Sequence, residues 1–387
     1  MNSQSWGDIV ARRARVRGCL LGGAIGDALG YPIEFQPLAS IRNGYGPSGV
    51  TGFLPVGGVV LGQVSDDTQM TLFTAEGLIR AYARYGPATD NGISSAGPVL
   101  VRNAYLRWLD TQNHPAPPPP AELAHDRTGW LRQQTWLYAR RAPGNACVSG
   151  LRYEHIPDKL GELGAPGPVN PDSKGCGTVM RSAPFGLTGM PVRRAFEFAA
   201  RCAQITHGHP TGYYAAGAFA AMIGHLLDGD SLEGAVLRSM ELLARYPGHE
   251  ETTAALRKAV DLAADGTATP EKVETLGGGW IAEEALAIAV YCALARPADP
   301  APRRTRVESA FLLSVNHSGD SDSTGSICGN LLGAHHGDLA LPPSWLTAVE
   351  GRGTITELAD DFSAAFHPLT HQPYNESFFA PGRYPRS

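Results

Sequence analysis

The most informative absences in this 387-residue sequence concern cysteine pairs, positive charge and long apolar runs. The six cysteines are scattered without a close pair, which argues against a zinc knuckle or a disulfide framework and favours a reducing compartment. A formal net charge of -5 indicates no basic surface for nucleic acid or anionic membranes. No uninterrupted apolar run approaches the roughly 20 residues that span a bilayer. We therefore expect a cytoplasmic protein whose partners are neither nucleic acids nor membranes.

Strand patterns are also scarce. Val59 to Leu61 is among the few β-branched clusters, and nothing suggests a parallel sheet. Apolar residues instead recur at helical spacing along alanine-rich segments. Helices are expected over residues 17–30, 66–82, 99–109, 130–138, 213–227, 232–246, 252–264 and 281–295, and from the region of Asp320 to Gly337. The sequence thus predicts an all-α fold.

Proline and glycine mark the expected irregular segments. Residues 42–62 and 296–306 are predicted loops, and residues 112–121 contain a proline-rich surface insertion. We expect one all-helical domain over residues 1–366 and an irregular tail over 367–387. The helix over 17–30 has four interior glycines, each costing on the order of 1 kcal/mol relative to alanine. Close packing against another backbone is the favoured compensation, and close approach of a ligand is the alternative.

Two clusters of acidic residues begin predicted helices. One is Ser65-Asp66-Asp67-Thr68, and the other places Asp320, Asp322 and Ser323 at a turn. A single aspartate would cap a helix, and Gln69 is spaced from Asp66 as in a capping box. Capping needs only one side chain, however, and neither cluster contains a basic residue. If the two helix starts converge, their oxygens suit Mg²⁺ or Mn²⁺ better than zinc, so a metal site is the alternative to simple capping.

Three further features could contribute to a site. Gly175, Gly177 and Thr178 precede a helical pattern and would let backbone amides approach a phosphate, although most short glycine loops are only turns. His207 and His209 have no carboxylate or cysteine at matching spacing, which favours a capping or ligand-contacting role over zinc ligation. Glu34 lies between apolar neighbours, where partial burial would raise its pKa, or it is simply solvated.

These motifs occur in a recognisable order. They are Gly26-Asp-Ala-Leu-Gly-Tyr-Pro-Ile-Glu-Phe35, Ser65-Asp-Asp-Thr68, Gly175-Cys-Gly-Thr-Val-Met-Arg181, Thr206-His207 and Gly319-Asp-Ser-Asp-Ser323. In this combination the chain, from about Arg17 to Gly337, resembles the ADP-ribosylglycohydrolase family. The resemblance implies a compact all-helical protein with two Mg²⁺ or Mn²⁺ ions in a central cleft. It also implies hydrolysis of the bond between ADP-ribose and a protein side chain or a small acceptor.

The same resemblance implies roles for individual residues. The metal ligands would be Ser65, Asp66, Asp67, Asp320, Asp322 and Ser323. The catalytic set would be Glu34, Asp67 and Asp322, with Glu34 handling protons beside the metals. Substrate contacts would come from Gly175, Gly177, Thr178, Met180 and His207. The family more often has threonine where Ser65 and Ser323 stand, and asparagine where Cys176 stands.

The activity implied is metal-dependent release of free ADP-ribose, with arginine as the acceptor by similarity to the family's type member. Serine-linked ADP-ribose and O-acetyl-ADP-ribose are alternative substrates. A non-catalytic ADP-ribose-binding module and a dimetal hydrolase of phosphoanhydride or phosphodiester bonds are alternative functions. The expected partner is an ADP-ribosylated protein or a small ADP-ribose conjugate, and the expected state is a monomer.

Overall fold

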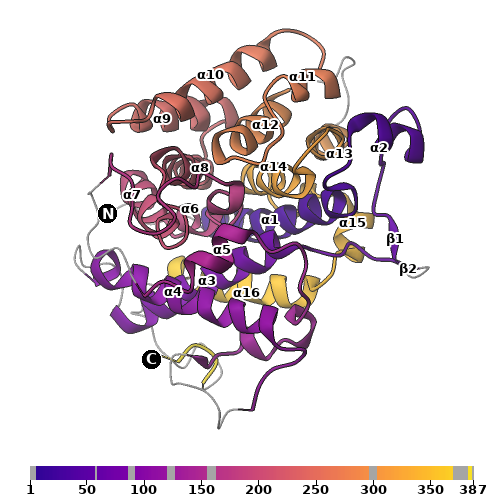
Figure 1. Ribbon diagram of the computed structural model, residues 1–387. Coiled ribbons are helices and arrows are strands. Elements are labelled where there is room, and N and C mark those ends of the chain that lie inside the picture. Colours follow the sequence, from indigo (N-terminus) through magenta and orange to yellow (C-terminus); the bar gives the residue numbers. More distant parts are fainter. Residues whose placement is uncertain are drawn as a thin grey trace.

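In a computed structural model of the protein, helices account for nearly all regular structure (Figure 1). The structure describes residues 6–56, 59–85, 92–119, 127–154, 163–295, 303–368 and 382–385. The only strands in these ranges are β1 (Pro55–Val56) and β2 (Val59–Val60), which form a two-residue antiparallel hairpin. The all-α prediction is therefore confirmed.

The longer helices are α1 (Trp6–Gly30), α3 (Asp66–Tyr85), α4 (Gly92–Asn113), α7 (Val192–Ala203), α8 (Pro210–Leu227), α9 (Leu232–Leu243), α10 (Glu250–Ala264), α12 (Ala282–Leu294), α13 (Arg303–Val315), α14 (Ser321–His336) and α16 (Arg352–Phe366). The short ones are α2 (Leu38–Tyr45), α5 (Asn145–Gly150), α6 (Ala183–Leu187), α11 (Pro270–Glu274) and α15 (Pro343–Ala348).

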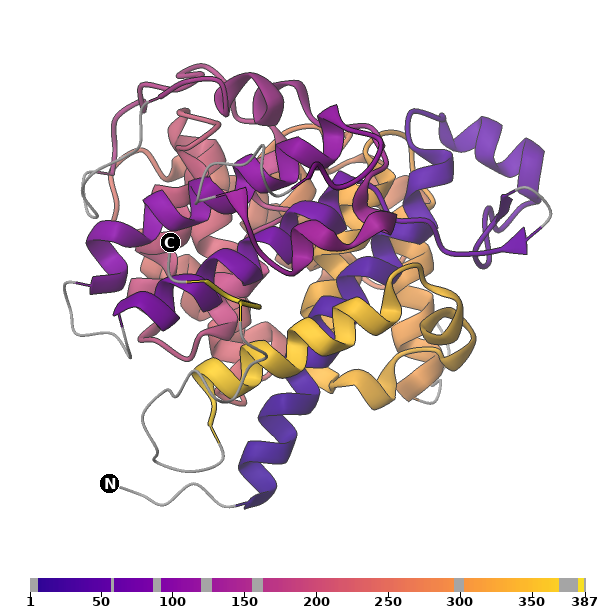
Figure 2. The same ribbon diagram turned by 90° about the horizontal axis from the view of Figure 1, so that it is seen from below.

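Helices α1 and α14 pack side by side through the middle of the molecule (Figures 1 and 2). Glycines on α1 face the α14 backbone at intervals of four residues. A Cβ added at Gly22 would lie 2.3 Å from the Gly329 carbonyl oxygen, and one at Gly18 would lie 2.4 Å from that of Gly333. The interior glycines of α1 thus permit backbone-to-backbone packing, as predicted.

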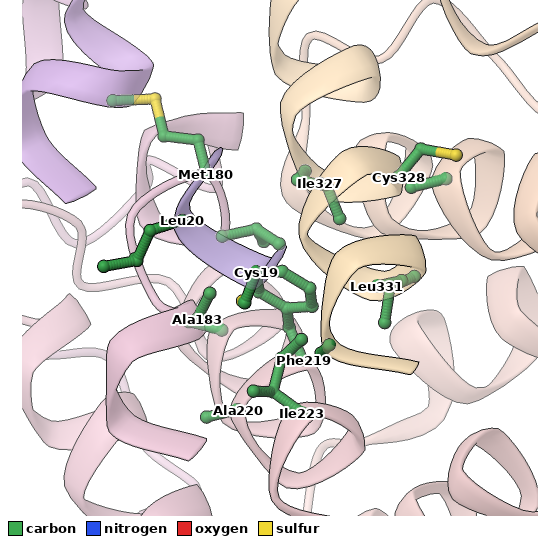
Figure 3. Close-up of a cluster of buried hydrophobic side chains, with 14 of the residues drawn as sticks. Cys19, Leu20, Met180, Ala183, Phe219, Ala220, Ile223, Ile327, Cys328 and Leu331 are labelled. Carbon is green, nitrogen blue, oxygen red and sulfur yellow. The ribbon is translucent and has the colours of Figure 1, made fainter. Parts of the chain in front are cut away.

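The hydrophobic core surrounds this helix pair. Helix α8 is buried along almost its whole length, which explains why its sequence is mostly alanine and apolar residues. Figure 3 shows Phe219 and Ile223 of α8 among side chains of α1 and α14, including Cys19 and Leu331. On another side, α16 packs against both α1 and α3 (Figure 2). The helices that carry the two aspartate clusters, α3 and α14, therefore both pack against α1.

Several local predictions differ from the structure, because α1 and α4 begin earlier than predicted and the predicted loop over 42–62 includes the end of α2 and the β1–β2 hairpin. Residues 130–138 form two 3₁₀ turns, Leu131–Gln133 and Thr135–Leu137, in place of a helix. Contacts with α16 hold this segment, because the Trp136 indole nitrogen donates to Thr354 Oγ1 at 3.1 Å. The predicted loop over 296–306 is also too long, since α13 begins at Arg303. The described residues of the predicted irregular tail, 367–368 and 382–385, have no helix or strand, although Tyr384 is buried and the Arg383 guanidinium lies 3.7 Å from the centre of the Trp130 ring.

The surface insertion predicted over residues 112–121 begins later, because Gln112 and Asn113 belong to α4 and Gln112 is buried. Residues 114–119 have no helix or strand and are exposed or half-exposed, whereas residues 120 and 121 lie outside the described residues. Within the described ranges, no helix combines the length and apolar character needed to cross a bilayer.

Candidate dimetal site

Both aspartate clusters open onto one cavity of about 520 Å³. Helix α3 begins at Asp66, and α14 begins one residue after Asp320, whose side chain accepts a hydrogen bond from the Ser323 amide. The two helix starts converge because the glycine contacts hold α1 against α14, and α1 also contacts α3. The predicted residues that line the cavity are Glu34, Asp66, Asp67, Gly175, Gly177, Met180, His207, Asp320, Asp322 and Ser323.

Glu34, Asp320 and Asp322 form the tightest acidic group. One oxygen from each can be chosen so that all three lie within 4.8 Å of one another. Glu34 comes directly after a 3₁₀ turn, Tyr31–Ile33, which follows the last residue of α1. Its side chain is only half-buried. The two aspartates are buried. Three carboxylates at this separation repel one another unless protons or a cation reduce their charge.

Burial and mutual repulsion dominate the electrostatics of the site. Burial, and then the charges of Asp322 and Asp320, raise the pKa of Glu34 to about 10. Burial and the neighbouring Asp322 also raise the pKa values of Asp66, Asp67 and Asp320 well above the ordinary range. The predicted rise in the pKa of Glu34 therefore agrees with its surroundings.

The donor atoms are of the kind that a hard divalent cation prefers. Asp67 Oδ1 is buried and has no hydrogen-bond partner among the described residues, so it is an oxygen whose lone pairs are available. The carboxylates provide oxygen ligands, which Mg²⁺ and Mn²⁺ prefer. No lysine or arginine is among the described residues that line the cavity, so protein cations do not neutralise the cluster from within it.

A thiol lies directly beside these oxygens. Cys176 Sγ donates a hydrogen bond to Asp320 Oδ2 at 2.8 Å. Burial and the charge of Asp320 raise the pKa of this thiol well above its usual range. The residue where the family more often has asparagine thus contacts a candidate metal ligand.

Two predicted site residues have other contacts. Ser65 is fully buried outside the cavity lining, and its Oγ accepts a hydrogen bond from the Asp67 amide at 3.2 Å. Thr178 is likewise buried away from the cavity, and its hydroxyl donates to the Gly212 carbonyl at 2.8 Å. In the structure Ser65 caps α3, and Thr178 joins the glycine loop to α8.

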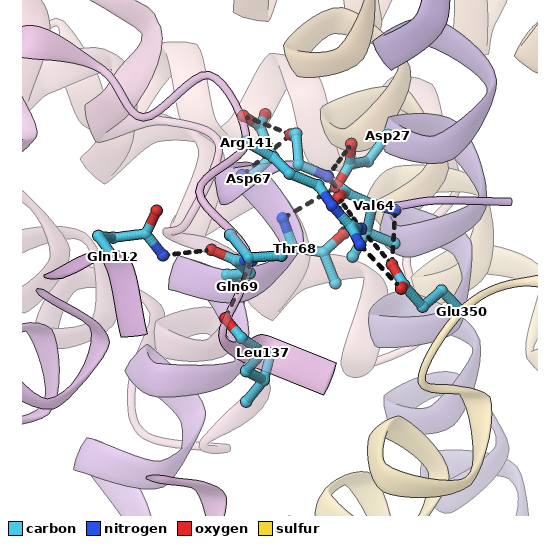
Figure 4. A network of polar contacts seen from close by, with 11 residues as sticks. Asp27, Val64, Asp67, Thr68, Gln69, Gln112, Leu137, Arg141 and Glu350 are labelled. Carbon is cyan, nitrogen blue, oxygen red and sulfur yellow. Dashed lines mark hydrogen bonds and ion pairs between the residues drawn. The ribbon is translucent and has the colours of Figure 1, made fainter. Parts of the chain in front are cut away.

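Asp27 is an important residue whose contact with the site the sequence did not predict. It is fully buried on α1 and accepts hydrogen bonds from the amides of Ser65 and Thr68 at 2.9 and 3.1 Å (Figure 4). A carboxylate from another helix therefore caps the start of α3. Burial, and then the charge of Asp322, raise the pKa of Asp27 to about 7. In the sequence, the feature that points to a role for Asp27 is its position as a lone acidic residue within an apolar, glycine-rich helical segment.

The predicted capping box at Gln69 is wrong. Its side-chain amide donates to the carbonyls of Leu137 and Ala139 and accepts from the Trp108 indole at 3.1 Å. Gln69 therefore attaches α3 to neighbouring segments, and Asp27 satisfies the helix start instead. His209 does cap α8, because its Nδ1 accepts from the Thr211 amide at 3.2 Å, which confirms the capping interpretation for that histidine.

The mouth of the cavity contains a pair of stacked aromatic rings. Phe35 and Trp280 have ring centres 5.0 Å apart and planes inclined by 22°. Phe35 is 68% exposed and has a φ of +67°, which is unusual for a residue with a side chain. Trp280 is tied to the glycine loop, because its carbonyl accepts from the Cys176 amide at 3.1 Å.

The structure therefore defines an all-helical protein built on two glycine-packed central helices, with a carboxylate-lined cavity at the starts of α3 and α14. Residues 9–372 match the model of the ADP-ribosylglycohydrolase family. The chain belongs to this family, as its motifs predicted.

Individual relatives agree with this assignment. The chain is 24% identical to the ADP-ribosyl-dinitrogen reductase glycohydrolase of Rhodospirillum rubrum, over 87% of this chain and 90% of that protein. It is 30% identical to the ADP-ribosylhydrolase ARH3 of Homo sapiens over 50% of this chain, a match that spans 59% of ARH3. A solved structure named ADP-ribosylglycohydrolase-related protein complex aligns with a TM-score of 0.59 and 25% identity, covering 92% of this chain and 99% of that one.

Proposed function

We propose that this chain is a dimetal-dependent hydrolase that cleaves the glycosidic bond between ADP-ribose and an arginine side chain, releasing free ADP-ribose. The observation that carries the proposal is the cavity itself, in which carboxylates from α3, α14 and the segment after α1 meet. Membership of the ADP-ribosylglycohydrolase family supports the reaction class.

Asp66, Asp67, Asp320 and Asp322 would hold the two Mg²⁺ or Mn²⁺ ions, with Ser323 as a further oxygen donor at the cavity wall. When bound, such ions would supply positive charge at the ribose hydroxyls and acidify a coordinated water. The unpartnered Asp67 Oδ1 and the absence of lysine and arginine from the described lining fit this arrangement. Ser65 would act through Asp67, whose amide it caps.

Glu34 would handle protons. Cleavage at the anomeric carbon proceeds through a state with oxocarbenium character, in which the bond to the acceptor breaks as water attacks. Glu34 is half-buried and lies beside Asp320 and Asp322, whose charges raise its pKa. With those charges offset by bound cations, Glu34 would be ionised and could accept a proton from the attacking water. The electron pair of the broken bond stays on the departing nitrogen, so the guanidinium leaves as a neutral guanidine, and the proton from Glu34 then restores the ordinary charge of arginine.

A cationic acceptor suits the rest of the cavity. The described lining has no lysine or arginine, so no basic side chain of the lining repels an incoming guanidinium. The rings of Phe35 and Trp280 at the mouth also offer exposed faces on which a guanidinium can lie. The full-length similarity to the Rhodospirillum rubrum glycohydrolase supports the same reaction class.

The test is release of free ADP-ribose from an arginine-ADP-ribosylated protein, with Mg²⁺ or Mn²⁺ and with EDTA. Serine-linked ADP-ribose and O-acetyl-ADP-ribose serve as parallel substrates. Metal-dependent release from the arginine conjugate is the expected result. Release only from the other substrates would overturn the acceptor, AMP as the product would indicate phosphoanhydride cleavage, and tight binding without product would indicate a binding module.

A further inference from the structure

Three buried residues, of which His207 lines the cavity, form a series of hydrogen bonds that the proposed mechanism does not use. Arg181 Nη2 donates to Thr206 Oγ1 at 2.5 Å, and Thr206 Oγ1 lies 2.8 Å from His207 Nδ1. Their side chains are almost completely shielded from solvent. His207 lines the cavity at the end of this series.

The geometry of these hydrogen bonds indicates which ring nitrogen of His207 carries the proton. The Thr206 oxygen already accepts a hydrogen bond from Arg181, and its own hydrogen must go to a different atom. The two candidates are the Ala203 carbonyl at 3.5 Å and His207 Nδ1 at 2.8 Å. The shorter contact is well within the range for a hydroxyl donor, whereas 3.5 Å is at its limit. Nδ1 is therefore the acceptor, and the neutral ring carries its proton on Nε2.

Arg181 also keeps the ring neutral. Its guanidinium contacts the sulfurs of Met70 and Cys147 and lies 4.4 Å from the centre of the Tyr105 ring, and no carboxylate pairs with it among the described residues. Burial, and then this positive charge, lower the pKa of His207 to about 3. A second proton on the ring is therefore strongly disfavoured.

The Nε2 side of the ring faces the glycine loop. A Cβ added at Gly175 would lie 3.2 Å from Nε2, and one at Gly177 would lie 3.4 Å from it. Nε2 has no hydrogen-bond partner among the described residues, although the other ring nitrogen is fully engaged. A donor of fixed direction therefore points toward the glycine loop, whose backbone amides are expected to approach a phosphate.

We propose that Arg181 and Thr206 are positioning residues that fix His207 as a neutral Nε2–H donor to a phosphate oxygen of the bound nucleotide. This inference rests on the proposed function for the identity of the ligand. The positioning is independent of ambient pH over the neutral range, because the ring stays uncharged there. It also separates anion recognition from the metal site, since none of the three residues belongs to the acidic cluster.

The first test reads the ring directly. Two-bond ¹H–¹⁵N correlation spectra of histidine-labelled protein, with His207→Gln to assign the signal, should show the Nε2–H form of His207. A predominant Nδ1–H form in the unaltered protein would overturn the proposal. This measurement needs neither substrate nor turnover, so its result does not depend on whether the proposed function is correct.

The second test measures binding of ADP-ribose and of adenosine by titration calorimetry in the presence of Mg²⁺. Thr206→Val removes the hydroxyl, and affinity for ADP-ribose should fall about tenfold while affinity for adenosine is unchanged. Thr206→Ser restores the hydroxyl and should restore both the affinity and the Nε2–H signal. Equal losses for the two ligands in Thr206→Val, or loss of affinity in Thr206→Ser as well, would overturn the positioning role. If no ADP-ribose binds the unaltered protein, the proposed function fails while the spectra still decide the tautomer.

Discussion

Gly26 of α1 and Gly325 of α14 meet backbone to backbone: a Cβ added at Gly26 would lie 1.9 Å from the Gly325 carbonyl oxygen. The contact lies beside the site, because Asp27 follows Gly26 and Asp322 lies one helical turn before Gly325. Because Asp27 of α1 caps α3, the packing of α1 on α14 also fixes the position of the start of α3, where the aspartates lie.

Gly26→Ala should destabilise the protein strongly. The added methyl group forces the two helices apart, and overpacking of this kind costs about 1–3 kcal/mol, or more where only backbone can move. Urea unfolding measures the loss. Gly353→Ala is the matched control, because position 353 is in α16 with nothing within 4 Å of an added Cβ. That variant should gain about 0.5–1 kcal/mol from helix propensity, and comparable losses in both variants would contradict the packing argument.

Glu34→Gln should abolish most turnover while leaving metal binding intact. Loss of a general acid-base group typically lowers the rate by about 10²- to 10⁴-fold. The measurement pairs ADP-ribose release with the rise in melting temperature that added Mg²⁺ produces. Asp322→Asn should lose both, since Asp322 is a proposed ligand within the tightest acidic group. Full turnover in Glu34→Gln would remove it from the mechanism.

Glu76→Gln should destabilise the helix pair α3 and α4. Glu76 Oε2 accepts from Arg107 Nε at 2.9 Å, and both side chains are almost fully buried. Removing one partner leaves an uncompensated buried charge, at a cost of about 3–5 kcal/mol. Chemical denaturation tests this against Arg238→Gln, which breaks the exposed pair with Asp230 and should change stability by less than about 1 kcal/mol. Similar effects of the two substitutions would contradict the role of burial.

His207 should make the protein less stable in mild acid. Its pKa is about 3 in the folded protein against an ordinary 6.5, so the unfolded chain binds a proton that the folded one does not. The stability contribution of the neutral ring is therefore complete above pH 6.5 and is lost as the pH falls toward 3. Each pH unit below 6.5 should cost about 1.4 kcal/mol. Urea unfolding at pH 7.5 and pH 5.5 should show a smaller acid-induced loss in His207→Gln, and an identical loss would show that this ring is not buried as described.

Much of the fold could be predicted because helical periodicity survives in long segments such as α8 and α12. The pattern failed at residues 130–138, where contacts of Trp136 with Thr354 override a local helical preference. It also missed the start of α13, since Arg303 lies in a stretch whose prolines suggest a loop. Contacts between distant segments are not visible in a local pattern.

Some contacts of the candidate site could likewise be predicted from the sequence, and others could not. The acidic pairs mark the two helix starts as parts of a candidate metal site, because capping a helix needs only one carboxylate. The role of Asp27 could not be predicted, since it depends on α1 lying beside α3. Gln69 fits the spacing of a capping box, yet its amide is used by Leu137, Ala139 and Trp108. Spacing identifies what a side chain can do, and packing decides which partner it reaches.

The aromatic pair at the cavity mouth has a consequence for the history of the family. Phe35 holds a left-handed backbone, which costs about 1–3 kcal/mol for a residue with a side chain and persists only where contacts compensate. Its stacking partner Trp280 comes from a distant loop. Positions 35 and 280 should therefore change together among relatives: where evolution places a small residue at 280, glycine should be favoured at 35.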